Sequence, residues 1–214
     1  MDGPRQSPTT ETLALEARRG SVQAFEELVA RHEAALFRFL FQRTRDTGAA
    51  EDLVQEAFLR AWQKLELYDP RWRFSTWLYT IASNLSVSAH RTRGREPELE
   101  EREHEPLGPA REPDPAQVAA QNDEGRALWD FAALVLREEE RSALWLRYAE
   151  ERSMDEIGAI LGRPAVTTRV MLFRARARLA EALAEAGATP HSRSPLALGT
   201  FASALAAPPQ GGST

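Results

Sequence analysis

A proline-rich acidic segment at 96–116 is incompatible with a single continuous fold for this chain. It carries eight acids, two arginines and five prolines, with almost no bulky apolar residue. Such a composition buries too little apolar surface to offset the entropy of ordering the backbone, which predicts a flexible, disordered linker over 96–120. The 214-residue chain is therefore predicted to contain two folded domains, at 12–95 and 121–187, followed by a low-complexity tail at 188–214.

The acidic linker also masks the charge of the two folded domains. Its formal charge is −6 against −5 for the whole chain, so the remaining residues sum to +1. The windows 70–95 and 157–180 contain no acid and five arginines each. Of the 27 basic residues all but Lys64 are arginine, whose planar guanidinium is suited to bidentate contacts with phosphates and bases. The net negative charge therefore does not exclude a nucleic-acid partner.

Helical periodicity runs through both domains. In the first, apolar residues recur at steps of three and four, which predicts a helix capped by Ser21, a second over about 47–67 and a third capped by Ser75. A break is expected at 68–70, where Tyr-Asp-Pro interrupts the pattern. Because no stretch alternates with a period of two, the predicted fold class is all-α, with two small helical domains.

The second domain has the helix stop and start signals of a helix-turn-helix. A short apolar helix is expected to stop at Gly162, and Pro164 is well placed to begin a longer helix rich in arginine. In a helix-turn-helix the second helix enters the major groove of DNA. An ordinary αα-hairpin would have the same pattern, so the spacing alone leaves both readings open.

Several function classes are disfavoured by composition. Without cysteine the chain has no disulfide, no thiolate metal site and no cysteine nucleophile, and its four histidines are scattered. We therefore expect no catalytic residue, no metal, no cofactor and no small-molecule substrate. No apolar run approaches the roughly 20 residues that span a bilayer, and the polar start lacks a signal-peptide core. The expected location is the cytoplasm, without membrane insertion.

Aromatic residues concentrate between positions 58 and 79. Those on apolar helix faces are predicted to be core: Phe58, Trp62 and Trp77. Two others alternate with arginine in the loop before the third helix: Arg71, Trp72, Arg73 and Phe74. Aromatic faces stack on unpaired bases while arginine neutralises phosphate, so this alternation suggests single-strand binding.

Four segments carry a family resemblance. The run at 50–62, AEDLVQEAFLRAW, resembles the core-binding helix of bacterial sigma-70 family factors. The run at 74–85, FSTWLYTIASNL, resembles the following helix in the extracytoplasmic-function (ECF) group. In the second domain, 153–162 and 172–179 resemble the fourth conserved region of ECF factors. The resemblance implies that the domains are sigma region 2 and sigma region 4, and that the chain directs promoter recognition, DNA melting and transcription initiation.

The resemblance also implies partners and contact residues. Core RNA polymerase would be bound through its β′ clamp helices by region 2 and through its β flap by region 4, and an anti-sigma factor would hold the chain inactive. The residues implied on the β′ side are Glu51, Asp52, Gln55 and Glu56. Those implied at the minus-ten element, where a base is flipped out, are Arg71, Trp72, Arg73, Phe74, Asn84 and Arg91. Those implied at the minus-thirty-five element are Thr167, Arg169, Phe173 and Arg174.

The chain departs from the family pattern at five positions, which bear on promoter affinity. Arginine is usual where this chain has Thr80 and Ser83, aspartate at Ser88, and a serine and a basic residue at Val170 and Met171. Two alternatives stay open. One is a helix-turn-helix regulator that acts without docking on core polymerase. The other is a sigma-like polymerase-binding protein with weakened promoter reading.

Overall fold

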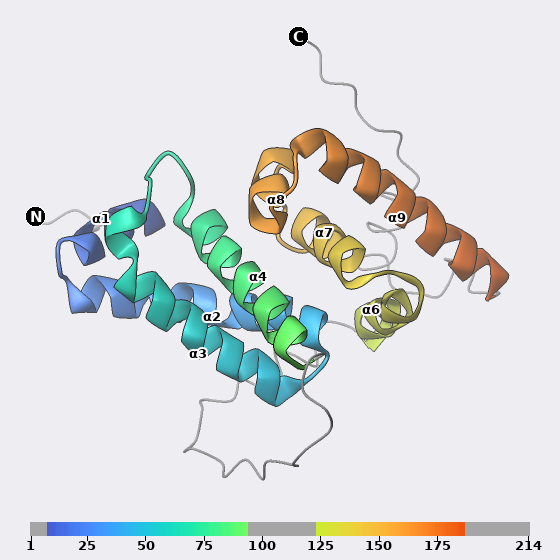
Figure 1. Cartoon of the computed structure of the whole chain (residues 1–214), viewed down its shortest axis with the longest axis horizontal. Coiled ribbons are helices and arrows are strands. Elements are labelled where there is room, and N and C mark those ends of the chain that lie inside the picture. Colours follow the sequence, from blue (N-terminus) through green and yellow to red (C-terminus); the bar gives the residue numbers. More distant parts are fainter. Residues whose placement is uncertain (1–7, 94–122, 187–214) are drawn as a thin grey trace, which may run out of the picture. The chain divides into compact units, whose positions relative to one another are not determined.

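The computed structural model describes residues 8–93 and 123–186, which are helical and contain no strand (Figure 1). The all-α prediction is thus confirmed for these residues, whereas the predicted linker and tail lie outside them. The chain divides into two compact units, one of residues 1–101 with 155–164, the other of 102–154 with 165–214.

Four helices and a short turn make up the part of the first unit at residues 8–93. They are α1 (Thr10–Arg18), α2 (Val22–Thr44), α3 (Thr47–Gln63), the 3-10 turn η1 (Leu65–Leu67) and α4 (Phe74–Arg93). The long α2 packs against α1, α3 and α4, and α3 also packs against α4. Figure 1 shows this bundle in blue to green. The bundle positions one exposed face of α3 and the loop between η1 and α4.

Side-chain caps fix where these helices begin. The hydroxyl of Ser21 accepts a hydrogen bond from the Ala24 amide at 3.2 Å, as predicted. Asp46 does the same for α3 by accepting from the Ala49 amide at 2.9 Å. Each cap satisfies an amide that has no partner inside its helix.

The core of the first unit is apolar and aromatic. Leu53, Val54, Ala57 and Phe58 of α3 are buried, as their helical spacing predicts. The largest fully buried side chains come from α2, the loop and α4: Leu28, Leu36, Phe39, Leu40, Tyr68, Phe74, Leu78 and Tyr79. The Phe39 and Tyr79 rings lie 5.0 Å apart between centroids, which locks α2 to α4.

Two predicted boundaries are corrected. The second predicted helix ends at Gln63 instead of 67, because the chain tightens into η1 before the loop. Ser75 is not the cap of α4. The helix begins at Phe74, and the Trp77 amide already donates to the Arg73 carbonyl at 3.2 Å, so Ser75 lies inside the first turn and is buried.

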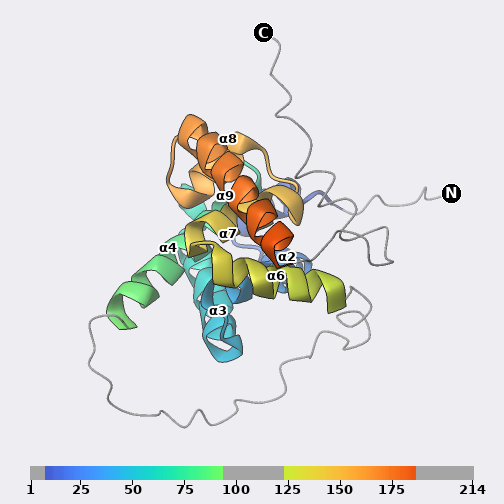
Figure 2. The ribbon, with the colours of Figure 1, turned by 90° about the vertical axis from the view of Figure 1, so that its right-hand side faces the viewer.

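The second unit is built on α6 (Asp123–Val135), α7 (Glu138–Tyr148) and α9 (Ala165–Glu185). Helix α9 packs on both α7 and α6 (Figure 2). The Trp129 and Trp145 rings lie 5.0 Å apart between centroids and join α6 to α7.

Helix α8 (Met154–Leu161) and α9 have helix-turn-helix connectivity, as predicted. The turn between them has three residues, and Gly162 within it has φ +65°, a left-handed conformation that glycine adopts without steric cost. Helix α9 begins at Ala165, one residue after Pro164. Ile157 and Ile160 of α8 are buried, which fixes the side of the short helix that faces protein.

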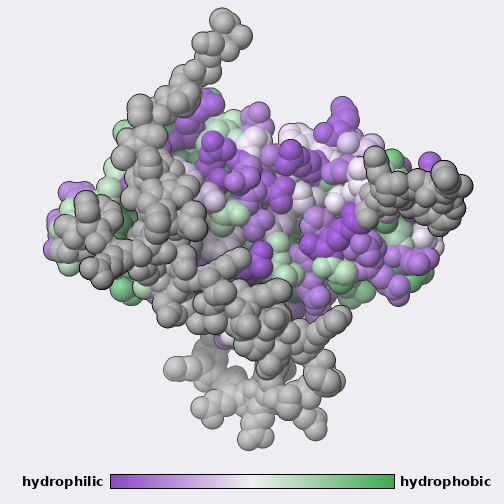
Figure 3. Space-filling view, turned by 180° about the vertical axis from the view of Figure 1, so that it is seen from behind, coloured by the Kyte–Doolittle hydropathy of each residue, from purple (hydrophilic) through white to green (hydrophobic). Residues whose placement is uncertain are grey.

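Polar residues dominate the face of the described residues that Figure 3 shows. In the view of Figure 3 the described residues are mostly hydrophilic, with smaller hydrophobic areas between them. Within 8–93 and 123–186, no helix combines the length and the apolar character needed to cross a bilayer.

Candidate functional site

The first candidate surface is the solvent-facing side of α3. Glu51, Asp52 and Gln55 are exposed, and Glu56 is half-buried. They lie opposite the buried apolar residues of the same helix, since positions three and four apart share one face. The predicted polar face is therefore present and accessible.

Two features of this face were not among the predictions from the sequence. Arg60 Nε donates to Glu56 Oε1 at 2.6 Å, which ties one of the predicted carboxylates to its own helix. Leu59 is 52% exposed, beside Gln55 and one turn along the helix. The face is thus an acidic rim around an apolar side chain.

Trp62 extends this apolar area, which corrects its prediction as a core residue. The side chain is 38% exposed, although its ring packs on Phe25 of α2 at 4.9 Å between centroids. Trp62 lies three residues beyond Leu59, so it sits at the edge of the solvent-facing side rather than beneath the helix. The predictions from the sequence did not include Leu59 on this face and placed Trp62 in the core. The spacing of seven residues from Gln55 to Trp62, about two helical turns, could have placed Trp62 on the same side as Gln55.

The second candidate surface is the loop that leads into α4. Asp69 to Trp72 form a β-turn in which the Trp72 amide donates to the Asp69 carbonyl at 3.0 Å. Pro70 occupies the second position of the turn, where its fixed φ is favourable. The Asp69 carboxylate accepts from the Arg71 amide at 3.0 Å and from Arg71 Nε at 2.8 Å. These hydrogen bonds hold the pKa of Asp69 below its usual value and raise the pKa of Arg71.

Tyr68 anchors the turn to the bundle. Its ring is buried, and its hydroxyl donates to the Trp72 carbonyl at 2.8 Å. Burial, with the nearby charges of Glu11 and Asp69, raises the pKa of Tyr68 to about 12, so the hydroxyl keeps its proton at neutral pH. The backbone of Trp72 is therefore held at both its amide and its carbonyl.

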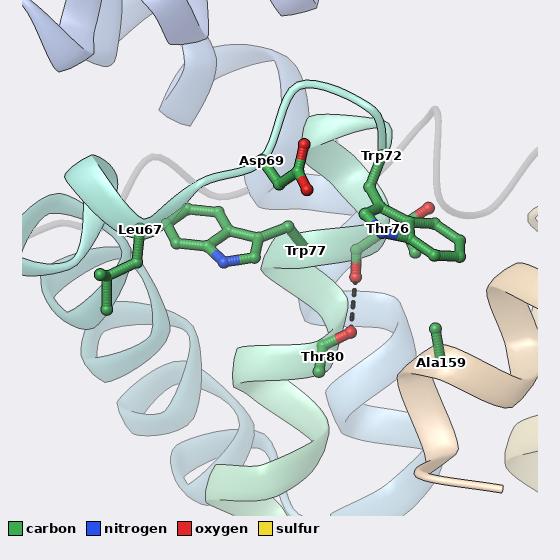
Figure 4. Close-up of a pocket in the computed structure, with 7 residues that line it drawn as sticks. All are labelled: Leu67, Asp69, Trp72, Thr76, Trp77, Thr80 and Ala159. Atoms are coloured by element: carbon green, nitrogen blue, oxygen red, sulfur yellow. Dashed lines mark hydrogen bonds between the residues drawn. The ribbon is translucent and has the colours of Figure 1, made fainter.

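The loop exposes three of the four predicted side chains. Trp72 is 44% exposed, and the side chains of Arg71 and Arg73 are largely in solvent. In Figure 4, Trp77 points toward Leu67, while Trp72 lies on the other side of α4 beside Thr76. The loop therefore presents the exposed ring of Trp72 between the guanidinium groups of Arg71 and Arg73.

The burial of Phe74 contradicts the prediction that its ring is available to stack on a base. Its side chain is fully buried, and its ring packs within 6 Å of the rings of Tyr68 and His32, at 5.7 Å each. As the first residue of α4 it faces the bundle, where it also contacts Trp77 at 5.8 Å. Trp77, predicted to be core, is half-buried in the same cluster.

Along α4, two of the three positions that depart from the family pattern donate their hydroxyls to backbone carbonyls of the same helix. Thr80 Oγ1 donates to the Thr76 carbonyl at 2.8 Å (Figure 4), and Ser88 Oγ donates to the Asn84 carbonyl at 2.9 Å. Ser83 is buried. Asn84 is exposed, as a contact to DNA requires, whereas Arg91 belongs to α4 with a side chain outside those described.

The third candidate surface is the outer side of α9. The predicted residues Thr167, Arg169, Phe173 and Arg174 are all exposed, and Phe173 is 61% exposed. Val170 is also exposed, while Met171 is half-buried. By contrast, Arg178 pairs with the carboxylate of Glu140 on α7, so it fastens α9 to its own unit rather than projecting toward DNA.

The described residues offer no cluster for a metal. Within 8–93 and 123–186, no three His, Asp or Glu side chains gather closely enough to hold an ion. The three surfaces are instead polar, cationic and aromatic, which is chemistry for binding macromolecules.

Two family models match the chain. Sigma-70 region 2 matches residues 28–96, which include α3, the loop and α4, and Sigma-70, region 4 matches residues 130–179, which include α8 and most of α9. The chain is 33% identical over 183 residues to the ECF RNA polymerase sigma factor SigE of Mycolicibacterium smegmatis, covering 85% of this chain and 70% of that protein. It is 31% identical over 174 residues to the ECF RNA polymerase sigma-E factor of Escherichia coli K12, covering 78% and 91%.

Solved structures share the fold. The sigma factor RpoE bound to the anti-sigma factor NepR, from Bartonella quintana, superposes with a TM-score of 0.60 at 27% identity, covering 76% of this chain and 98% of that one. CnrH in complex with the cytosolic domain of CnrY gives a TM-score of 0.58 at 25% identity, covering 82% and 97%.

Proposed function

Because this chain belongs to the sigma-70 family of transcription initiation factors, within the ECF group, we propose that α3 docks it on core RNA polymerase. The loop 68–73 and α4 then engage the minus-ten element, and α9 engages the minus-thirty-five element. The observation that carries this proposal is the outward face of α3, whose Asp52 and Gln55 lie exposed around Leu59.

The α3 face fits docking on the β′ clamp helices. Its polar rim, Glu51, Asp52 and Gln55, can pair with donors on a partner, and Leu59 with Trp62 supplies an apolar centre. A few anchor side chains that become fully desolvated at the centre of an interface carry most of its binding free energy, and a polar rim surrounds them. A helix-turn-helix regulator that acts alone would have no use for this face.

The loop fits an unpaired base of the minus-ten element. The turn holds Trp72 outward between Arg71 and Arg73, so a flipped base can stack on the indole while the guanidinium groups meet phosphates. Extruding a base costs a few kcal/mol, and stacking of about 1–3 kcal/mol offsets much of that cost.

Helix α9 fits the major groove of the minus-thirty-five element. Arg169 and Arg174 are exposed on the part of α9 at 165–180, which contains no acid, and can reach phosphates or guanine edges. Thr167 lies in the first turn, where side chains of a recognition helix contact bases.

We also propose what regulates the chain and where it acts. Both structural neighbours are complexes, one of them with an anti-sigma factor by name, and we extend that class of partner to this chain. Region 4 would also contact the β flap. The chain would act in the cytoplasm beside core polymerase, and it would catalyse no reaction itself.

Reconstitution tests the proposal. The chain mixed with core polymerase should initiate from specific sites in genomic fragments, whereas it should bind duplex DNA weakly alone. Asp52→Arg and Leu59→Asp should each lower affinity for core polymerase by tenfold or more, while Glu33→Arg, at an exposed acid of α2, should not. Specific binding to duplex DNA without core polymerase, or transcription unaffected by either α3 variant, would refute the proposal.

A further inference from the structure

Helix α9 carries apolar side chains on both its buried face and its exposed face. The buried face carries Thr168, Leu172, Ala175 and Leu179, which repeat at steps of four, three and four residues and pack inward. At about 100° per residue these side chains fall within one narrow stripe of the helix. This stripe fixes the rotation of α9 about its own axis, and therefore determines which residues face outward.

The outward face is apolar where a DNA-binding helix is expected to be polar. Val166 is 68% exposed, Val170 44% and Phe173 61%. From Thr168 they lie about 140° to 200° around the helix, on the side opposite the buried stripe. Three exposed bulky apolar residues on one face are costly in water unless a partner covers them.

We call Val166, Val170 and Phe173 the exposed stripe. The charges beside the exposed stripe indicate what the partner is. Arg169 and Arg174 are exposed and flank it, about 100° and 240° from Thr168. The sequence from 157 to 180 contains no acid. An apolar strip between two cations complements the major groove, in which phosphates line the edges and base edges form the floor.

One base presents an apolar group in that groove. The 5-methyl of thymine projects from the groove floor and is contacted by apolar side chains. From Val166 to Phe173 the helix rises about 10 Å, which spans about three base-pair steps of about 3.4 Å. We propose that Val166, Val170 and Phe173 read the methyl groups of two or three adjacent thymines in the minus-thirty-five element. This inference rests on the proposed function of α9.

Removing only the methyl groups tests this inference. The chain with core polymerase first selects its preferred upstream element from a randomised promoter library, scored by transcription. Each thymine of that element, on either strand, is then replaced by deoxyuridine, which lacks the methyl but pairs identically. At two or three adjacent positions, transcription at limiting holoenzyme should fall roughly three- to fivefold per methyl, as expected for burying one such group.

Variants of the exposed stripe then show whether its side chains cause the loss of transcription from deoxyuridine templates. Val170→Ala and Phe173→Ala should bring the thymine-to-deoxyuridine ratio toward one at their own positions. Leu134→Ala, at an 85% exposed leucine of α6, is the matched control and should leave every ratio unchanged. All three sites are on the surface, so circular dichroism should show each variant folded.

Three results would overturn the inference. Equal transcription from thymine and deoxyuridine templates at every position would show that no methyl is read. Variants that keep the ratio but abolish binding of a protein partner or self-association would show that the stripe is a protein interface. Absence of any promoter-specific transcript would overturn the proposed function itself, and the inference with it.

Discussion

Replacing Trp72 and Phe74 separately should separate DNA opening from folding. Both residues belong to one alternating sequence, yet Trp72 is 44% exposed and Phe74 is fully buried. Trp72→Ala removes a surface ring whose backbone stays held by the Tyr68 hydroxyl and the Asp69 carbonyl. The first variant should therefore change function, and a Phe74 variant should change stability.

The magnitudes differ enough to measure. Stacking of one base on an aromatic ring is worth about 1–3 kcal/mol, so Trp72→Ala should reduce open-complex formation about 5- to 150-fold. Phe74→Ala would cost about 3–5 kcal/mol, a large part of the stability of a small domain. Phe74→Leu removes three carbons at about 0.8 kcal/mol each, about 2 kcal/mol, and should leave the unit folded.

Two assays read the two effects. Denaturant unfolding followed by circular dichroism gives the free energy of unfolding, which should change by less than 1 kcal/mol in Trp72→Ala. Permanganate reactivity of unpaired thymines in the reconstituted promoter complex measures opening. Trp72→Phe keeps an aromatic face and serves as the matched control, with opening largely retained.

Either of two results would contradict the roles assigned to Trp72 and Phe74. Trp72→Ala could lower the free energy of unfolding as much as Phe74→Leu, which would mean that the ring is structural. Alternatively, Phe74→Leu could lose opening at temperatures where it is fully folded, which would mean that the buried ring takes part in binding.

Three further predictions follow from single contacts. Arg174→Ala should reduce transcription from promoters with a minus-thirty-five element about 5- to 150-fold without weakening core binding in a pull-down; lost core binding would contradict the assigned face. Asp46→Ala removes the cap of α3 and should lower the free energy of unfolding by about 0.5–2 kcal/mol in denaturant titrations. Hydrogen bonds from Arg71 hold the pKa of the Asp69 carboxyl below its usual value. The fluorescence of Trp72 in the loop should therefore stay constant as pH falls to the usual aspartate pKa, and should change only at lower pH, where the carboxylate is protonated. In Asp69→Asn that transition should be absent.

The helices were predictable because their determinants are local. Ser21 and the apolar spacing of α3 act within a few residues, and both are confirmed. The start of α4 was not predicted correctly, since the helix begins at Phe74 and Ser75 is buried in its first turn. Asp69 followed by Pro70 was the readable signal for the β-turn that precedes the helix.

Side-chain directions in the loop depended on contacts far apart in sequence. Phe74 faces inward because His32 of α2 and Tyr68 form a ring cluster that receives it. The pairing of Arg178 with Glu140 spans 38 residues, so spacing within α9 could not reveal it. The alternation of arginine and aromatic residues did not distinguish the two rings, and only the packing shows that Trp72 is exposed and Phe74 is buried.

The two kinds of contact proposed with DNA, arginine with phosphate and apolar side chains with thymine methyl groups, should respond differently to salt. Arginine–phosphate contacts weaken as salt displaces them, whereas apolar contacts with methyl groups do not. The loop relies on Arg71 and Arg73 on either side of one ring, while α9 places three apolar side chains between Arg169 and Arg174. Phosphate contacts position a protein and base contacts specify the site. Rising salt should therefore weaken promoter binding overall while the discrimination between thymine and deoxyuridine persists.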